Sequence, residues 1–98
     1  MLGITAGQRR SLRSRAHGLK PVVSISRNGL SGPVLKEIDA CLESHELVKI
    51  RVYGDDREER ERLLGEICER LDAAPVQHIG KLLVVWRPEA GDRKTGHS

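Results

Sequence analysis

The stretch that most constrains the fold is Leu82-Leu83-Val84-Val85-Trp86, because it is apolar at every position. A strand with one solvated face alternates apolar and polar residues, so a strand without alternation is covered on both faces. Gly80 separates this run from another apolar-rich run, residues 74–79, which predicts a hairpin turning near residues 79–81. We therefore expect residues 82–86 to form a central strand, with Trp86 in the core.

Three segments have the apolar spacing of helices. The helices are expected over about residues 5–17 and 33–46, and from just after residue 55 or 56 to about residue 71. Thr5 can cap the first, Pro33 suits the first turn of the second, and Asp55 or Asp56 can cap the third. The charged residues of the third helix, Arg60 among them, are expected to form a solvated face without a binding role.

Two more strands are predicted between the helices, over residues 21–26 and 47–53. The second alternates apolar and polar residues and so has one wetter face. The order is helix, strand, helix, strand, helix, strand, strand, which favours helices packed on a parallel or mixed sheet. The fold class is therefore α/β, with about four strands and three helices.

A chain of 98 residues is the size of one domain. From Arg87 onward the apolar pattern stops, so we expect a domain over residues 1–88 and a flexible tail over 89–98. The longest apolar run is only as long as a strand, and no apolar segment follows a basic start. We expect neither a membrane span nor a secretory signal, and a cytoplasmic location.

The residues of typical catalytic and metal sites lack the required patterns. Cys41 and Cys68 each lie on the apolar side of a helical pattern, so both are expected to be reduced core residues. The scattered histidines and two cysteines have no recognised metal-ligand spacing. The sequence also lacks a nucleophile elbow, a Walker-type loop and a Gly-x-Gly-x-x-Gly motif. We expect no metal, no cofactor and no enzymatic activity.

Charge is distributed unevenly along the chain. Residues 1–30 contain six basic and no acidic residues, whereas the remainder has 11 basic and 14 acidic residues. At helical spacing, Arg9, Arg10, Arg13, His17 and Lys20 fall beside a thin apolar seam. Such a stripe is typical of a polyanion-binding face, although a solvated basic helix without a partner would have the same pattern.

The turn between the first strand and the second helix contains Arg27, Asn28 and two glycines, but no acid. Glycines let backbone amides approach a phosphate closely, and a helix N-terminus directs N–H groups toward it. Arg27 can hold a phosphate with two hydrogen bonds. A plain connecting loop is the alternative interpretation.

Four stretches together resemble the stand-alone bacterial CRM domain of the YhbY type (CRM stands for chloroplast RNA splicing and ribosome maturation). These stretches are residues 8–23, 27–31, 37–49 and 79–88. The resemblance implies an RNA-binding module associated with precursors of the large ribosomal subunit. It also implies a four-stranded mixed sheet with three helices, similar to the C-terminal domain of translation initiation factor 3. The Gly-x-x-Gly loop of the family falls on residues 26–29, where Ser26 replaces the first glycine.

The sequence therefore predicts a non-enzymatic RNA-binding protein whose basic helix and glycine loop form one continuous cationic surface. The candidate RNA-binding residues are Arg9, Arg10, Arg13, Lys20, Ser26, Arg27, Asn28 and Gly29. The partner is expected to be large-subunit ribosomal RNA or its precursor particle, with no DNA or membrane partner and a monomeric chain favoured. RNA backbone is expected to contact the loop amides. The alternative is a protein-interaction module that docks a ribosomal protein or an assembly GTPase.

Overall fold

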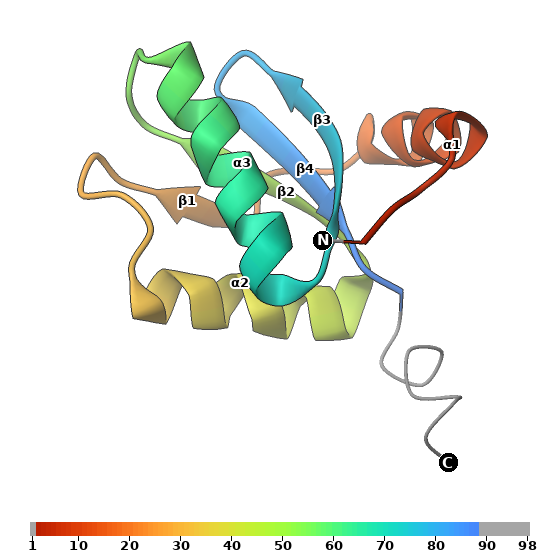
Figure 1. Cartoon of the computed structure of the whole chain (residues 1–98), viewed down its shortest axis with the longest axis horizontal. Helices are drawn as coiled ribbons and strands as arrows, with labels where there is room; N and C mark the ends of the chain where they lie inside the picture. Colours follow the sequence, from red (N-terminus) through yellow and green to blue (C-terminus); the bar gives the residue numbers. More distant parts are fainter. Residues whose placement is uncertain (1, 89–98) are drawn as a thin grey trace.

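The computed structural model describes residues 2–88, and the predicted tail over residues 89–98 lies outside them. The elements follow the predicted order (Figure 1). They are α1 (Ala6–Ala16), β1 (Val23–Ile25), α2 (Gly32–His45), β2 (Leu47–Val52), α3 (Arg57–Leu71), β3 (Ala74–Ile79) and β4 (Leu82–Trp86). Three helices and a four-stranded mixed sheet confirm the α/β prediction. No helix in the described part is long and apolar enough to cross a membrane.

The strands are arranged in the order β1-β2-β4-β3. β1 is parallel to β2, and β4 is antiparallel to both of its neighbours, which confirms its central place. Ile79 pairs with Leu82 across the hairpin, where Gly80 has a φ of 55°. Glycine adopts that left-handed conformation at no steric cost, so a tight two-residue turn forms here.

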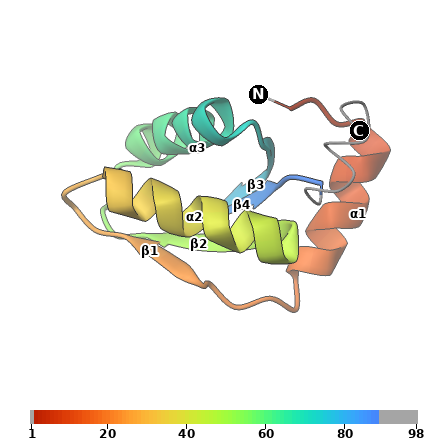
Figure 2. The same ribbon diagram turned by 90° about the horizontal axis from the view of Figure 1, so that it is seen from below.

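The sheet is covered on both faces, by two helices on one side and one on the other (Figure 2). Ile50 of β2 and Leu83 of β4 are fully buried in the core that α2 and α3 share with the sheet. On the other face, Leu12 of α1 packs with Leu47 and Val84. Because β4 lies between these two cores, it needs apolar side chains in both directions. Trp86 packs against the smaller core, as predicted.

Each helix begins at a side chain that accepts hydrogen bonds from its first turn. Thr5 forms a capping box with Gln8, Ser31 accepts from the N–H of Val34, and Asp56 accepts from the two N–H groups that follow Arg57. Such N-caps each stabilise a helix by about 1 kcal/mol. The predicted caps Thr5 and Asp56 are confirmed.

Two arginines that the apolar pattern assigned to solvent or to the chain end are buried. Arg60 of α3 donates to Nε2 of His78 (3.2 Å) and to the carbonyl of Gly54 (3.0 Å), so its place on a solvated face was wrong. Arg87 lies just beyond β4, is 2% exposed and hydrogen-bonds residues of α2 and α3. Neither role is visible in apolar spacing, because hydrogen bonds to polar partners hold both side chains in place.

The two cysteines are free thiols, as predicted. Cys68 is buried in the core between the sheet and its two helices, and Cys41 is partly buried against the same core. Burial raises the pKa of Cys68 to about 12 and also raises the pKa of Cys41. Both thiols are therefore protonated at neutral pH and behave as small apolar side chains.

Candidate nucleic-acid interface

α1 presents two arginines to the part of the sheet that it leaves open. Leu12 and Ala16 pack onto the sheet, and this contact fixes the rotation of the helix. Arg10 and Arg13 then line a groove of about 400 Å³. The groove is completed by His17, Lys49, Gln77, Ile79 and Leu82, together with the residues of α1 around Ser14. Its lining combines basic and apolar side chains, and no acid lines it among the described residues.

β2 adds two cations that the sequence-based set did not include. Lys49 and Arg51 alternate with the buried Val48 and Ile50, so they point to the same face as α1. Arg51 is exposed and lies with its Cζ atom 5.4 Å from the ring centroid of Tyr53. The alternating pattern of residues 47–53 could have identified these two cations, because both polar residues on the wetter face of the predicted strand are basic.

The predicted residues of the first helix do not all serve the same surface. Arg9 is half-buried, and its Nε donates to the carbonyl of Pro75 on β3 (3.4 Å), which ties α1 to the sheet. Arg10 and Arg13 are exposed in the groove, whereas the exposed Lys20 follows the helix and borders a separate hollow. Arg9 is thus part of the support of the helix, and the free charge is carried by its neighbours.

The glycine loop uses its own amides to close a turn. The N–H of Asn28 donates to Oγ of Ser26 (3.3 Å), and the N–H of Gly29 donates to the carbonyl of Ser26 (2.9 Å). Gly29 has a φ of 88°, a value that glycine tolerates and other residues rarely adopt. Since these two amides are already engaged, the expected contact with RNA backbone depends on the exposed side chains of Arg27 and Asn28.

Acidic residues lie close to this loop. A shallow hollow joins Ser26, Arg27 and Gly29 to the segment between β2 and α3, including Asp55 and Asp56. A hydrogen bond from Lys81 is the main cause that lowers the pKa of Asp55, and Arg27 adds a smaller electrostatic contribution. Acids thus line the hollow beside the loop, whereas no acid lines the groove of α1 in the described residues.

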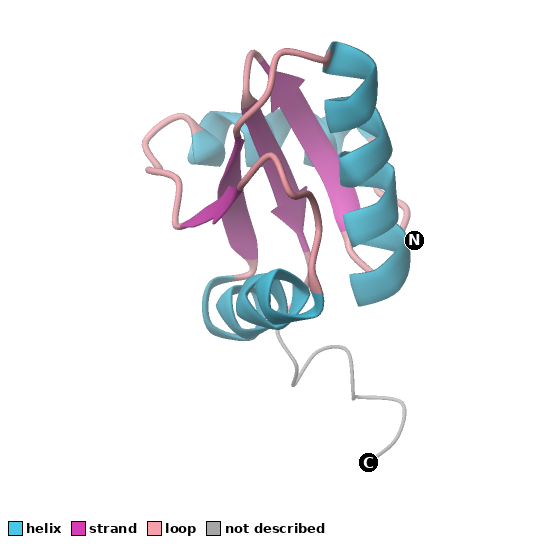
Figure 3. Cartoon of the chain, turned by 90° about the vertical axis from the view of Figure 1, so that its left-hand side faces the viewer, coloured by secondary structure: helices cyan, strands magenta, loops and turns pink. Residues whose placement is uncertain are grey.

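The expected single surface made by neighbouring helix and loop was wrong. The loop after β1 and helix α1 lie at opposite ends of the molecule (Figures 1 and 2). Figure 3 looks from the loop end, with α1 behind the sheet. Residues 17–22 return the chain from α1 along the sheet before β1 begins, and this separates the two basic segments. Lys49 and Arg51 lie on the strand between them.

The described residues contain no group of three or more His, Cys, Asp or Glu side chains that could hold a metal ion. The described part of the chain is a sheet-and-helix module with a basic groove on one face.

The comparisons with known proteins place this module in a family. Residues 4–87 match the family model of the CRS1/YhbY (CRM) domain, and the chain belongs to that family. A Haemophilus influenzae relative named "RNA-binding protein" is 42% identical over 88 residues, covering 90% of this chain and 89% of the relative. The Pseudomonas aeruginosa relative named "Probable RNA-binding protein PA4753" is 37% identical over 86 residues, covering 88% and 83%. The solution structure of the hypothetical protein SAV1595 from Staphylococcus aureus matches with a TM-score of 0.80 and 34% identity, covering 91% of each chain.

Proposed function

We propose that this protein binds RNA, mainly by contacts to phosphates, and that it acts in assembly of the large ribosomal subunit without catalysing a reaction. The observation that carries the RNA proposal is the groove in which Arg10, Arg13 and Lys49 converge without a lining acid. Basic side chains on a firm scaffold are the electrostatic requirement for binding a polyanion. The names of the two curated relatives support RNA as that polyanion.

The interface has two contact regions in this proposal. The first comprises the basic residues of α1 with Lys49 and Arg51, and the second is the loop over residues 26–29, which contributes Arg27 and Asn28. An RNA that touches both must extend along the sheet face between them. Trp86 is packed in the smaller core, so a row of aromatic platforms is not available, and backbone and shape recognition outweigh base stacking.

Salt dependence of RNA binding tests this function. If about four to six phosphates are neutralised, the log–log slope of affinity against salt concentration is on the order of −3 to −5. Arg10→Glu with Arg13→Glu should make the slope shallower by about 1 to 2, since two phosphate contacts are lost. Arg57→Glu with Arg70→Glu, both on exposed positions of α3, changes net charge equally and should leave most of the binding.

Two further measurements separate the loop from the helix and RNA from a protein partner. Arg27→Glu should weaken binding less than the double change on α1, because it changes one charge instead of two and acids already line the hollow beside the loop. In a sucrose gradient, the wild-type protein should sediment with large-subunit precursors and the α1 variant should not. A salt-independent interaction, or equal behaviour of the α1 and α3 variants, would contradict phosphate binding by the groove and favour docking to a protein.

A further inference from the structure

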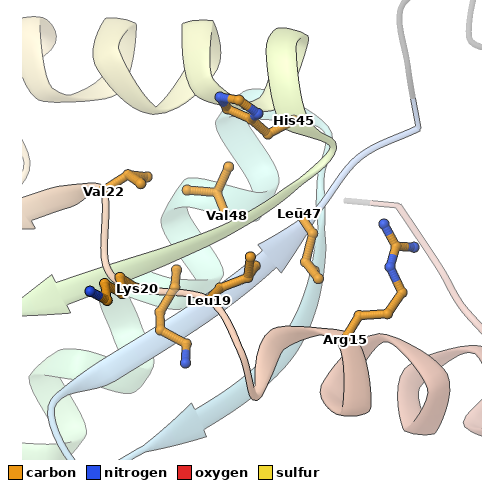
Figure 4. Close-up of a pocket in the computed structure, with 8 residues that line it drawn as sticks. Arg15, Leu19, Lys20, Val22, His45, Leu47 and Val48 are labelled. Atoms are coloured by element: carbon orange, nitrogen blue, oxygen red, sulfur yellow. The ribbon is translucent and has the colours of Figure 1, made fainter.

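A second hollow lies beside the groove, at the edge of the sheet. It is enclosed by the end of α1, the segment over residues 19–22, the last turn of α2 and the start of β2 (Figure 4). Its volume of about 350 Å³ is within the range of roughly 300–1,000 Å³ that is usual for small-ligand sites. The hollow exists because β1 begins pairing only at Ile50, so the first residues of β2 have no β1 residue beside them.

The walls of this hollow are apolar and partly open to solvent. Leu19 is 38% exposed and Val22 is 55% exposed. They are two of the four large hydrophobic residues that are exposed in the described part of the chain. Leu47 and Val48 of β2 line the inner side. The N–H of Val22 donates to the carbonyl of Lys49 (3.0 Å), so the outer wall is fixed to β2. The hollow is therefore a preformed apolar surface.

The rim of the hollow is basic. Arg15, Lys20, His45 and Lys49 line it, and no acid does so in the described part of the chain. Glu46, which does not line the hollow, has its carboxylate 3.8 Å from the guanidinium of Arg15. Lys20 and Lys49 belong to different segments, the chain between α1 and β1 and strand β2, and both line the hollow. A matching ligand combines negative charge with an apolar part.

We propose that this hollow binds one unstacked nucleotide of a single-stranded RNA segment. The base packs against Leu19 and Val22 with the imidazole of His45 beside it, and the adjoining phosphates lie near Lys20 and Lys49. Because Lys49 also lines the groove of α1, a strand held in that groove continues directly into the hollow. Bases in a duplex are stacked and paired, whereas unpaired bases can be turned outward into such a site. The inference rests on the proposed RNA-binding function and gives it a preference for single strands.

The test compares an unstructured oligo-uridine strand with an RNA duplex of the same length. Leu19→Ser with Val22→Ser removes the apolar wall without changing charge. It should weaken binding of the single strand about tenfold, the effect of losing roughly 55 Å² of buried apolar contact, and change duplex binding by less than about twofold. Leu35→Ser is the control, because Leu35 is partly exposed in the first turn of α2 and lines neither the hollow nor the groove.

A strand with abasic riboses shows whether the base itself is recognised. Wild-type protein should bind the abasic strand about tenfold more weakly than oligo-uridine, and the Leu19/Val22 variant should not distinguish the two strands. If binding depends steeply on salt but neither the Leu19/Val22 substitution nor the loss of the bases weakens it, the nucleotide site is overturned and the phosphate groove remains. If neither RNA binds, the proposed function fails with it. Displacement by an acidic peptide, but not by oligo-uridine, would assign the hollow to a protein partner.

Discussion

The buried guanidinium of Arg87 allows a quantitative prediction about stability. Its Nη1 donates to Oδ1 of Asp39 (2.7 Å) and to the carbonyl of Leu71 (2.9 Å). Its Nη2 donates to the carbonyl of Asp39 (3.2 Å) and to Oε1 of Glu43 (3.1 Å). One side chain just beyond β4 thus joins α2 to the end of α3. Arg87→Met keeps the aliphatic stem and removes all four of these hydrogen bonds.

The expected loss follows from what remains behind. The carboxylates of Asp39 and Glu43 are 48% and 41% exposed, so water replaces the guanidinium there at little cost. The carbonyl of Asp39 keeps its hydrogen bond within α2, but the partly buried carbonyl of Leu71, at the last residue of α3, loses a donor at a cost of about 1–3 kcal/mol. The substitution also removes the desolvation cost of the buried Arg87 charge, which offsets part of that loss in stability. We expect the free energy of unfolding to fall by about 2 kcal/mol.

Urea denaturation followed by circular dichroism measures this change in the free energy of unfolding. In a thermal melt, Tm should fall by about 8–16 °C in a domain of this size. The matched control is Arg70→Met, because Arg70 is 60% exposed and pairs only with Glu66 in the described contacts. That variant should lose less than about 1 kcal/mol. Equal stabilities for the two variants would refute the argument that Arg87 holds the helices through the partly buried carbonyl of Leu71.

Two further predictions concern single titratable groups. In the native protein, a thiol reagent at mildly alkaline pH should react slowly with Cys68 and faster with the partly buried Cys41. In guanidinium chloride both thiols should react at once. Fast reaction of both thiols in the native protein would contradict the burial that raises their pKa values. The ammonium of Lys81 lies 3.1 Å from Asp55 and lowers the pKa of that carboxyl. The stabilisation by this ion pair is therefore present above the ordinary aspartate pKa and is lost as pH falls through the lowered pKa. Lys81→Met should raise the pKa of Asp55 toward the ordinary value in a carboxyl NMR titration, with Lys81→Arg as the charge-preserving control; an unchanged titration would show that the pair does not form in solution.

Part of the candidate site was predictable from sequence because the signals are local. The helical spacing of α1 brought Arg10 and Arg13 to one side of a thin apolar seam, and packing of Leu12 confirms that arrangement. Lys49 and Arg51 were present in the alternation of β2 but had no apparent relation to α1, which lies far from them in the sequence. Arg9 was grouped with the exposed arginines, although its spacing alone cannot show the carbonyl of Pro75 that holds it.

The sequence alone determined where the elements begin and what each must bury. Thr5 and Asp56 cap helices through bonds within a few residues, and the unbroken apolar run of β4 requires cover on both faces. Only the tertiary structure decided which helix covers which face, and with it the distance between α1 and the glycine loop. The physical reason is range: dihedral preferences, caps and periodicity act over a turn or two of chain. The meeting of Lys49 with α1, or of Arg87 with α2, depends on how whole layers pack.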